Sequence, residues 1–180
     1  MVYSPSVERL CITFEPETQD SLQATDSALR RLTHPHPAFR EARPARFPSL
    51  KALRLGGLEC SDDALRSVFS TSSPTLERLA LELTPAGTRG LCLLFDTHNV
   101  GKAKEILLPQ LRVLRVFSPE GETFPVTLLS AVLERRIAVS EGRLLDAIVL
   151  PRETVDPADL GVIFPLARTV VLFDGDEDPA

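Results

Sequence analysis

Three groups of polar residues have types and spacing that could do chemistry. His34 and His36 flank a proline and could offer two imidazoles to a metal ion, but no nearby Cys, Asp or Glu completes a ligand set. His98 beside Asp96 could act as a base with its orienting carboxylate, yet the chain has no Gly-x-Ser-x-Gly elbow and no glycine-rich phosphate loop. The acidic run at 174–178 lacks the remaining positions of an EF-hand loop. A solvated loop, a helix end and a solvated tail are the favoured interpretations, so we expect no enzyme activity, no metal and no cofactor.

Three arginines suggest that the chain recognises another protein. They are Arg54, Arg78 and Arg115. The planar guanidinium group makes paired hydrogen bonds with a carboxylate or a phosphate. These arginines are therefore the candidate partner-binding residues, and an acidic or phosphorylated protein segment is the expected ligand. The alternative, which the sequence alone favours, is that they are ordinary exposed strand residues paired with Glu77 or Glu82.

A repeated pattern supplies the strands that would position these arginines. Six segments place apolar residues at a first position, three residues later, and two residues after that. The last two positions have the period of a strand, whereas a bend returns the first side chain to the same core. Each segment therefore predicts a short strand with one buried face. The segments are Val7–Ile12, Leu50–Leu55, Leu76–Leu81, Leu111–Val116, Leu145–Leu150 and Leu166–Val171, the last with Thr169 where an aliphatic residue is expected.

Aligning the six segments assigns the arginines to rows across the sheet. Residues between the strand leucines point out of the core, onto the concave face with which a solenoid binds its partners. The alignment puts Arg54 and Arg115 in one row and Arg9, Arg78 and Arg168 in the next. The three candidate arginines then fall on successive strands and form one exposed binding surface, with the loop at 33–49 at its border.

Helical spacing separates the predicted strands. Apolar residues recur at helical intervals in three of the gaps, and Thr88–Phe95 is a further candidate helix among glycines. Ser61 precedes two aspartates and predicts a capped helix start. The residues with helical spacing are Leu22, Leu29 and Leu32, then Leu65, Val68 and Phe69, then Leu128, Leu129, Val132 and Leu133.

The alternation of strands and helices predicts an α/β fold. Strands joined by helical crossovers lie parallel, and stacked units of this kind form a solenoid. We therefore predict an irregular leucine-rich-repeat solenoid in which about six strands form a curved parallel sheet with helices on its convex side. The strands should follow the order of the sequence and centre on Leu10, Leu53, Leu79, Leu114, Ile148 and Val170.

Length and composition indicate one domain over residues 1–180. A chain of 180 residues with 43% hydrophobic and 25% charged residues has the usual composition of a globular domain. The Pro/Arg-rich stretch at 33–49 is expected to be a surface loop and residues 174–180 an acidic tail in solvent.

Charge and cysteine content bear on the compartment and the partners. A net charge of -5 argues against nucleic acid as the partner, because that requires a basic footprint. Three cysteines without CxxC spacing suit buried thiols in a reducing compartment. No signal peptide and no apolar run long enough for a membrane helix is recognisable. We therefore expect a cytoplasmic or nuclear protein with no membrane partner.

The second repeat carries a resemblance to a known family. Leu50-Lys-Ala-Leu53-Arg-Leu55 runs into Cys60-Ser61-Asp62-Asp63-Ala64-Leu65, which resembles the leucine-rich repeat of F-box proteins, where the strand leads to Ile-Thr-Asp-x-x-Leu at the helix start. The chain from Val7 to Asp174 looks like the irregular repeat region of fungal F-box-like proteins. Two features depart from that pattern: no F-box segment precedes the first strand, and Leu58 stands where the family has Asn or Cys.

The resemblance implies a non-catalytic protein-binding module, similar to the substrate-recognition region of an F-box ubiquitin-ligase subunit. A generic repeat scaffold without a link to ubiquitin ligase is the alternative. An enzyme of unknown type is the more distant one.

Overall fold

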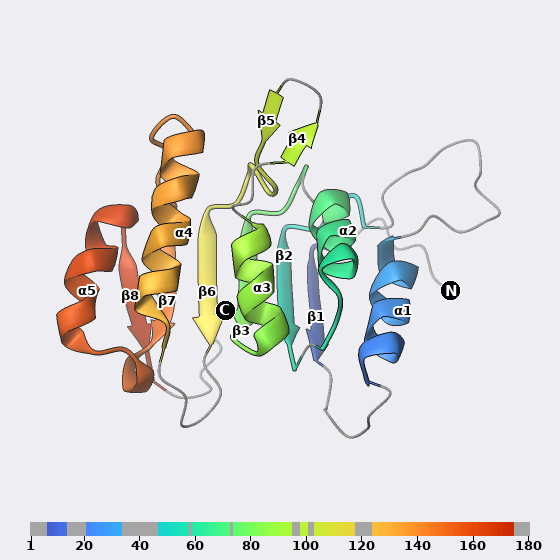
Figure 1. Cartoon of the computed structure of the whole chain (residues 1–180), viewed down its shortest axis with the longest axis horizontal. Coiled ribbons are helices and arrows are strands. Elements are labelled where there is room, and N and C mark those ends of the chain that lie inside the picture. The colour runs from blue at the N-terminus through green and yellow to red at the C-terminus, as the bar shows by residue number, and fades with distance from the viewer. Residues whose placement is uncertain are drawn as a thin grey trace.

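A six-stranded parallel sheet is the central element of the computed structural model (Figure 1). The structure describes residues 7–13, 21–33, 47–57, 59–72, 74–94, 98–100, 103–117 and 124–174. Neighbouring strands follow the order β1-β2-β3-β6-β7-β8, which is also their order along the chain. The strands of the sheet are β1 (Arg9–Thr13), β2 (Ala52–Gly56), β3 (Arg78–Glu82), β6 (Val113–Phe117), β7 (Ala147–Pro151) and β8 (Val170–Phe173).

Helices connect the consecutive strands. The described residues form α1 (Ser21–Thr33), α2 (Asp62–Ser72), α3 (Pro85–Leu93), α4 (Val126–Val139) and α5 (Pro157–Ile163), together with the short 3-10 helices η2 (Arg152–Thr154) and η3 (Phe164–Leu166). Between α3 and β6 the chain adds a small antiparallel hairpin of β4 (His98–Val100) and β5 (Ala103–Glu105), which no sequence pattern predicted.

Side-chain caps define three of the helix starts. The Ser61 hydroxyl accepts a hydrogen bond from the Ala64 N–H at 3.3 Å, which confirms the predicted start of α2. Helix α3 begins at Pro85 rather than at Thr88, because Thr84 caps it and proline suits the first helical position. Asp156 caps α5 in the same way, and this short helix was missed.

The predicted ladder of core residues is present in register. Leu10 pairs with Leu53, Leu53 with Leu79 and Leu79 with Leu114, followed by Ile148 and Val170. Leu53, Leu79 and Leu114 are buried in one hydrophobic cluster with the inner faces of the helices. The strand centres and the all-parallel sequential sheet are therefore confirmed.

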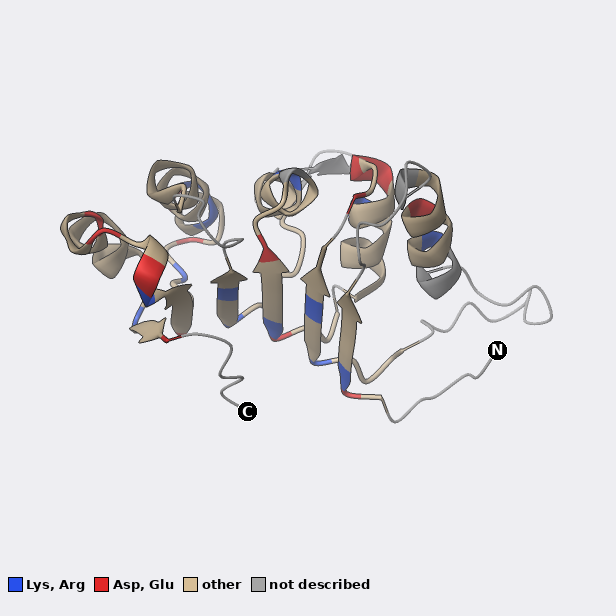
Figure 2. Ribbon diagram, turned by 90° about the horizontal axis from the view of Figure 1, so that it is seen from below, with Lys and Arg blue, Asp and Glu red and all other residues tan. Residues whose placement is uncertain are grey.

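The described helices all lie on one side of the sheet, as Figure 2 shows in a view turned by 90°. A doubly wound α/β sheet reverses its strand order and carries helices on both faces. Here the order never reverses, so every crossover returns along the same face. The side of the sheet opposite the core ladder is not covered by any described helix.

The sixth repeat was aligned one residue too early. The bridge from Leu145 runs to Ala167, so Ala167 takes the first core position rather than Leu166. Val170 and Leu172 then follow on the core side, whereas Thr169 and Val171 are exposed. The 3-10 helix η3 ends at Leu166, and Ala167 is the first extended residue after it, so the strand pattern of the sixth unit begins at Ala167.

Several expectations fall outside the described residues or need correction. Residues 34–46 of the predicted loop and 175–180 of the predicted tail are not described. Cys60 is buried as expected, but Cys11 and Cys92 are exposed, so the prediction of three buried thiols was wrong. Within the described residues, no helix is long and apolar enough to cross a membrane.

Candidate partner-binding face

The uncovered side of the sheet, called the open face below, carries the candidate arginines. Strand period two sends alternate residues of each strand to this side, away from the core ladder. Its middle row consists of residues that pair directly from strand to strand: Cys11, Arg54, Ala80, Arg115, Val149 and Val171. Arg54 and Arg115 therefore share a row, as predicted, and Ala80 separates them.

Two phenylalanine rings hold these arginines in place. The guanidinium carbon of Arg54 lies 4.6 Å from the centroid of the Phe117 ring, and that of Arg115 lies 4.5 Å from the same centroid. Arg115 also lies 4.2 Å from the centroid of Phe173. The two rings meet edge to face with centroids 5.6 Å apart. Cation–π attraction thus orders the cluster, because the ring faces carry negative charge density.

The three candidate arginines differ in exposure and position. Arg115 is only 8% exposed, so the expectation that it is freely accessible was wrong. Its burial follows from the aromatic rings of β6 and β8 packed around it. Arg54 is partly exposed and Arg78 is exposed, but Arg78 lies in the neighbouring row, where it pairs with Ala52 and Val113. Arg9 pairs with Ala52 as well, so Arg9 and Arg78 share that row as predicted.

Glu82, one of the expected arginine partners, is bound to the backbone. Its carboxylate accepts a hydrogen bond from the Gly57 N–H at 2.6 Å. Gly57 has a φ of 59°, a conformation that glycine adopts without strain. The carboxylate therefore fixes the turn that follows β2.

A row of charged residues of alternating sign precedes the strands. Glu8 pairs with Lys51 at 3.1 Å, and Asp146 pairs with Arg112 at 3.7 Å and with Arg168 at 3.6 Å. Arg168 thus belongs to this row and not to the row of Arg78, where the sequence alignment had placed it. The difference follows from the one-residue shift of the sixth repeat.

The open face changes character from one end of the sheet to the other. On β1, Arg9, Cys11 and Thr13 are exposed, which makes that end polar. Towards β8, the middle row continues with the buried Val149 and the exposed Val171. The face thus changes from exposed polar and cationic side chains on β1 to β3 to an exposed apolar side chain on β8.

Phe117 and Phe173 were not among the site residues predicted from the sequence. Both follow an outward-facing residue by two positions, Arg115 and Val171 respectively, so the strand period alone places them on the open face. That spacing was the available signal.

The residues considered for metal binding or catalysis gather into no site that the structure describes. His34, His36 and Asp96 lie outside the described residues, and of His98 only the backbone, in β4, is described. Asp174 makes an ion pair with Arg152 at 2.6 Å. Among the described residues, no group of three or more His, Cys, Asp or Glu could hold a metal ion.

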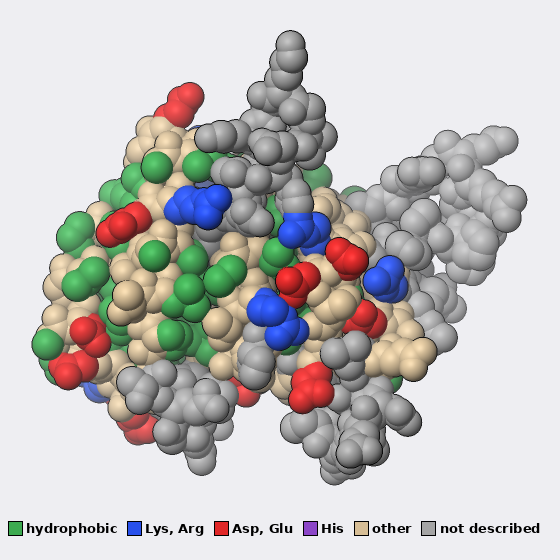
Figure 3. All heavy atoms as spheres, viewed as in Figure 1, with side chains coloured by type: hydrophobic (Ala, Val, Ile, Leu, Met, Phe, Trp, Pro, Cys, Tyr) green, Lys and Arg blue, Asp and Glu red, His purple; other side chains and the backbone are tan. Residues whose placement is uncertain are grey.

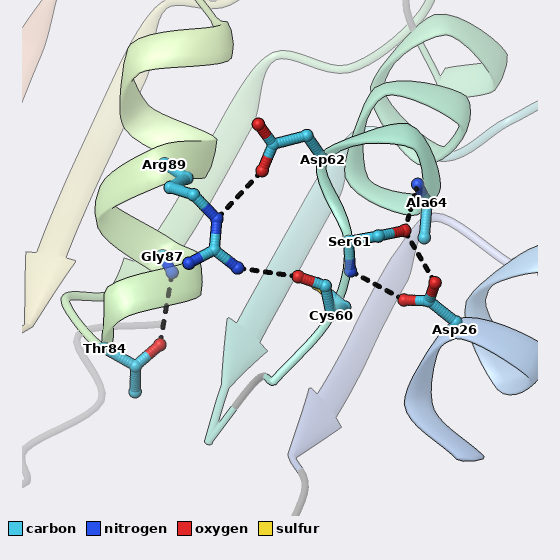
Figure 4. A network of polar contacts seen from close by, with 8 residues as sticks. All are labelled: Asp26, Cys60, Ser61, Asp62, Ala64, Thr84, Gly87 and Arg89. Atoms are coloured by element: carbon cyan, nitrogen blue, oxygen red, sulfur yellow. Dashed lines mark hydrogen bonds and ion pairs between the residues drawn. The ribbon is translucent and has the colours of Figure 1, made fainter. Parts of the chain in front are cut away.

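A network of polar contacts on the helix side of the sheet connects neighbouring helices to one another (Figure 4). Asp26 of α1 accepts hydrogen bonds from the Ser61 N–H at 2.7 Å and from the Ser61 hydroxyl at 2.6 Å. Arg89 of α3 donates to Asp62 at 2.8 Å and to the Cys60 carbonyl at 2.8 Å. The network ties the start of α2 to the helices on either side.

Cys60 lies in this network but is poorly suited to act as a nucleophile. Burial, reinforced by the negative charge of Asp26, raises the pKa of the Cys60 thiol from 9.0 to about 12. The thiolate is the reactive form of cysteine, so Cys60 remains a protonated core residue at neutral pH.

Comparisons of this chain with protein-family models, with curated proteins and with solved structures find no match.

Proposed function

We propose that this chain is a non-catalytic protein-binding module, a leucine-rich-repeat-like solenoid, and that it binds an acidic or phosphorylated segment of a partner across the open face. The observation that carries the proposal is the cluster in which Arg54 and Arg115 stack on Phe117. An uncovered sheet face bearing ordered guanidinium groups is a recognition surface rather than a reaction centre.

The repeat architecture supports this proposal. Each unit adds one strand beside the previous one, and the same pattern position fills the core in every unit. Figure 2 shows the sheet bowed towards its helix layer. In solenoids of this kind the inner sheet face is the surface that binds partners.

The aromatic rings would increase the affinity of the arginines. An arginine that is already stacked loses less side-chain freedom when it binds, so more of the interaction energy appears as affinity. Both guanidinium groups lie within 4.6 Å of one ring centroid, which keeps the two positive charges close together. A carboxylate or phosphate placed near Arg54 would relieve their mutual repulsion.

Arg78 would extend the surface for a longer ligand. Adjacent strands lie about 4.8 Å apart, so an extended peptide that crosses the strands meets a new side chain at each step. Arg78 and Arg9 in the neighbouring row provide further exposed cationic groups for acidic residues of such a peptide.

A peptide-binding measurement tests the proposal. The probes are a fluorescein-labelled peptide rich in glutamate and phosphoserine, and the same peptide with glutamine and serine instead. We expect the chain to bind the acidic peptide, with an affinity that falls as salt is added, because salt screens exposed charges. The neutral peptide should bind much more weakly.

Matched variants locate the binding surface. Arg54→Glu combined with Arg78→Glu should abolish binding of the acidic peptide. Arg30→Glu combined with Arg135→Glu makes the same change in net charge at exposed positions of α1 and α4 and should leave the affinity almost unchanged. Equal losses in both double variants would show a general charge effect and contradict the proposal.

A further inference from the structure

The C-terminal end of the sheet exposes apolar side chains. Within the described residues, the large hydrophobic side chains that are exposed are Val162 at 50%, Phe164 at 55% and Val171 at 41%. They belong to α5, η3 and β8, the last elements of the fold. Figure 3 shows hydrophobic side chains gathered on the side of α4 and α5. Terminal units of repeat proteins usually present a polar outer surface, so this end has the character of an interface.

The opposite edge of the sheet has the polar character of a protected end. β1 exposes Arg9, Cys11 and Thr13, and the Glu8–Lys51 ion pair lies just before it. Charged side chains at an edge strand oppose pairing with another strand. Of the two ends of the sheet, only the β8 end therefore has large exposed apolar side chains among the described residues.

The backbone of β8 has hydrogen-bonding groups directed outward. The Ile148 N–H donates to the Thr169 carbonyl at 2.9 Å, so Thr169 and Val171 turn their backbone groups towards β7. The backbone N–H and C=O groups of alternate residues in a strand point to opposite edges. Those of Val170 and Leu172 therefore point away from β7. β8 is the last strand in the sheet order, and no described strand pairs with this edge.

The sequence around β8 is self-complementary about Val171. If two copies of β8 pair antiparallel around a two-fold axis at Val171, Val170 of one copy lies opposite Leu172 of the other. Both residues belong to the core side of the sheet, so the faces of the two sheets match. The same register places exposed Arg168 of one copy opposite exposed Asp174 of the other, at both ends of the pairing.

We propose that β8 pairs with β8 of a second copy of this chain, which forms a two-fold dimer with one continuous sheet. Val170 and Leu172 would exchange backbone hydrogen bonds, and Val171 would face its own equivalent. Val162 and Phe164 would pack between the helix layers of the two copies. A two-fold axis perpendicular to the sheet keeps both open faces on the same side, so the dimer would bind its partner bivalently. The dimer itself does not depend on the function proposed above, whereas its bivalent binding rests on that function.

The molecular mass in solution gives the first test. Light scattering over a concentration series should show a species of twice the 19.8 kDa chain mass. Val171→Lys should convert it to the monomer, because two ammonium groups would then face each other across the axis. Thr13→Lys on β1 is the matched control at the other edge and should leave the dimer intact. Circular dichroism confirms that each variant is folded.

Disulfide crosslinking tests the register itself. In a chain with Cys11→Ser and Cys92→Ser, Val171→Cys should form a symmetric crosslinked dimer under mild oxidation. Residues paired in this way lie about 4.5 Å apart at Cα, which is within the range of a disulfide. Thr169→Cys alone should not crosslink, whereas a mixture of the Thr169→Cys and Phe173→Cys chains should.

Three results would overturn the dimer proposal. The first is a monomeric chain at every concentration. The second is a dimer that Val171→Lys leaves intact, because its interface would then lie elsewhere. The third is efficient crosslinking of Thr169→Cys alone without crosslinking of Val171→Cys.

Discussion

Arg136 of helix α4 donates a hydrogen bond to the carbonyl of Leu108 at 3.0 Å, although the arginine is only 3% exposed. It also donates to the carbonyls of Leu107 and Leu111, each at 3.5 Å. Leu108 has a φ of 53°, which is unusual for a residue with a side chain. The guanidinium group thus holds the turn that leads into β6, the strand that carries Arg115 and Phe117.

Replacing Arg136 should destabilise the fold. Arg136→Met keeps the apolar stem but leaves buried carbonyls without their donor, at a cost of about 1 to 3 kcal/mol for an unsatisfied buried group. Arg136→Lys should lose less, because one ammonium can still reach a carbonyl. Urea denaturation measures both. A Met variant as stable as the native chain would show that this contact contributes nothing.

The core ladder predicts a large effect at its centre. Leu79→Ala should cost about 2 to 5 kcal/mol of unfolding free energy, because it opens a cavity between Leu53 and Leu114. Arg78→Ala on the same strand is the control and should stay within about 0.5 kcal/mol, as expected for an exposed residue. Similar midpoints for the two variants in chemical denaturation would contradict the register.

Two glycines of α3 should respond in opposite directions to the same substitution. A Cβ at Gly87 would lie 1.8 Å from the Glu82 carbonyl oxygen, so Gly87→Ala must displace backbone and should cost roughly 1 to 3 kcal/mol. A Cβ at Gly90 would meet Leu65 at an ordinary 3.5 Å, and alanine favours the helix by up to about 1 kcal/mol. Thermal denaturation should therefore separate the two variants. If the Gly87→Ala variant had the same melting temperature as the Gly90→Ala variant, that result would contradict the close approach of α3 to β3.

Cys60 should make stability fall at alkaline pH. Its pKa is raised from 9.0 to about 12 in the folded chain, so above pH 9 the unfolded chain releases a proton that the folded chain retains. The contribution is fully present below pH 9 and is lost as pH rises towards 12, by at most about 4 kcal/mol. The measurement is the difference in unfolding free energy between the native chain and Cys60→Ala across this range. A difference that does not change with pH would contradict the shift.

The strands were predictable from local sequence because each one carries its own core pattern. The spacing that makes Leu53, Leu79 and Leu114 equivalent depends on no other part of the chain, and their register followed directly. The pattern failed at the sixth unit because it favours large aliphatic residues. Leu166 was preferred to Ala167, although the turn before β8 brings the smaller residue to the core.

The binding face was less predictable because it depends on contacts between distant strands. Sequence periodicity placed Arg115 on the open face but could not show that Phe173, which belongs to β8, covers it. Exposure of an arginine is set by its neighbours across the sheet, and β7 lies between these two strands. The contact of Glu82 could not be predicted for the same reason, because its hydrogen-bond partner Gly57 lies in the turn after another strand.

The sequential strand order has a consequence for how the chain is made. Each strand of the six-stranded sheet pairs with the strand of that sheet that precedes it in the sequence. Every unit therefore leaves the ribosome after its neighbour has already emerged. No strand waits for a distant partner, in contrast to sheets in which late strands insert between early ones. Among the described strands, β8 is the last to emerge, so its outer edge becomes available for pairing with a second copy only after the other five strands of the sheet have been made.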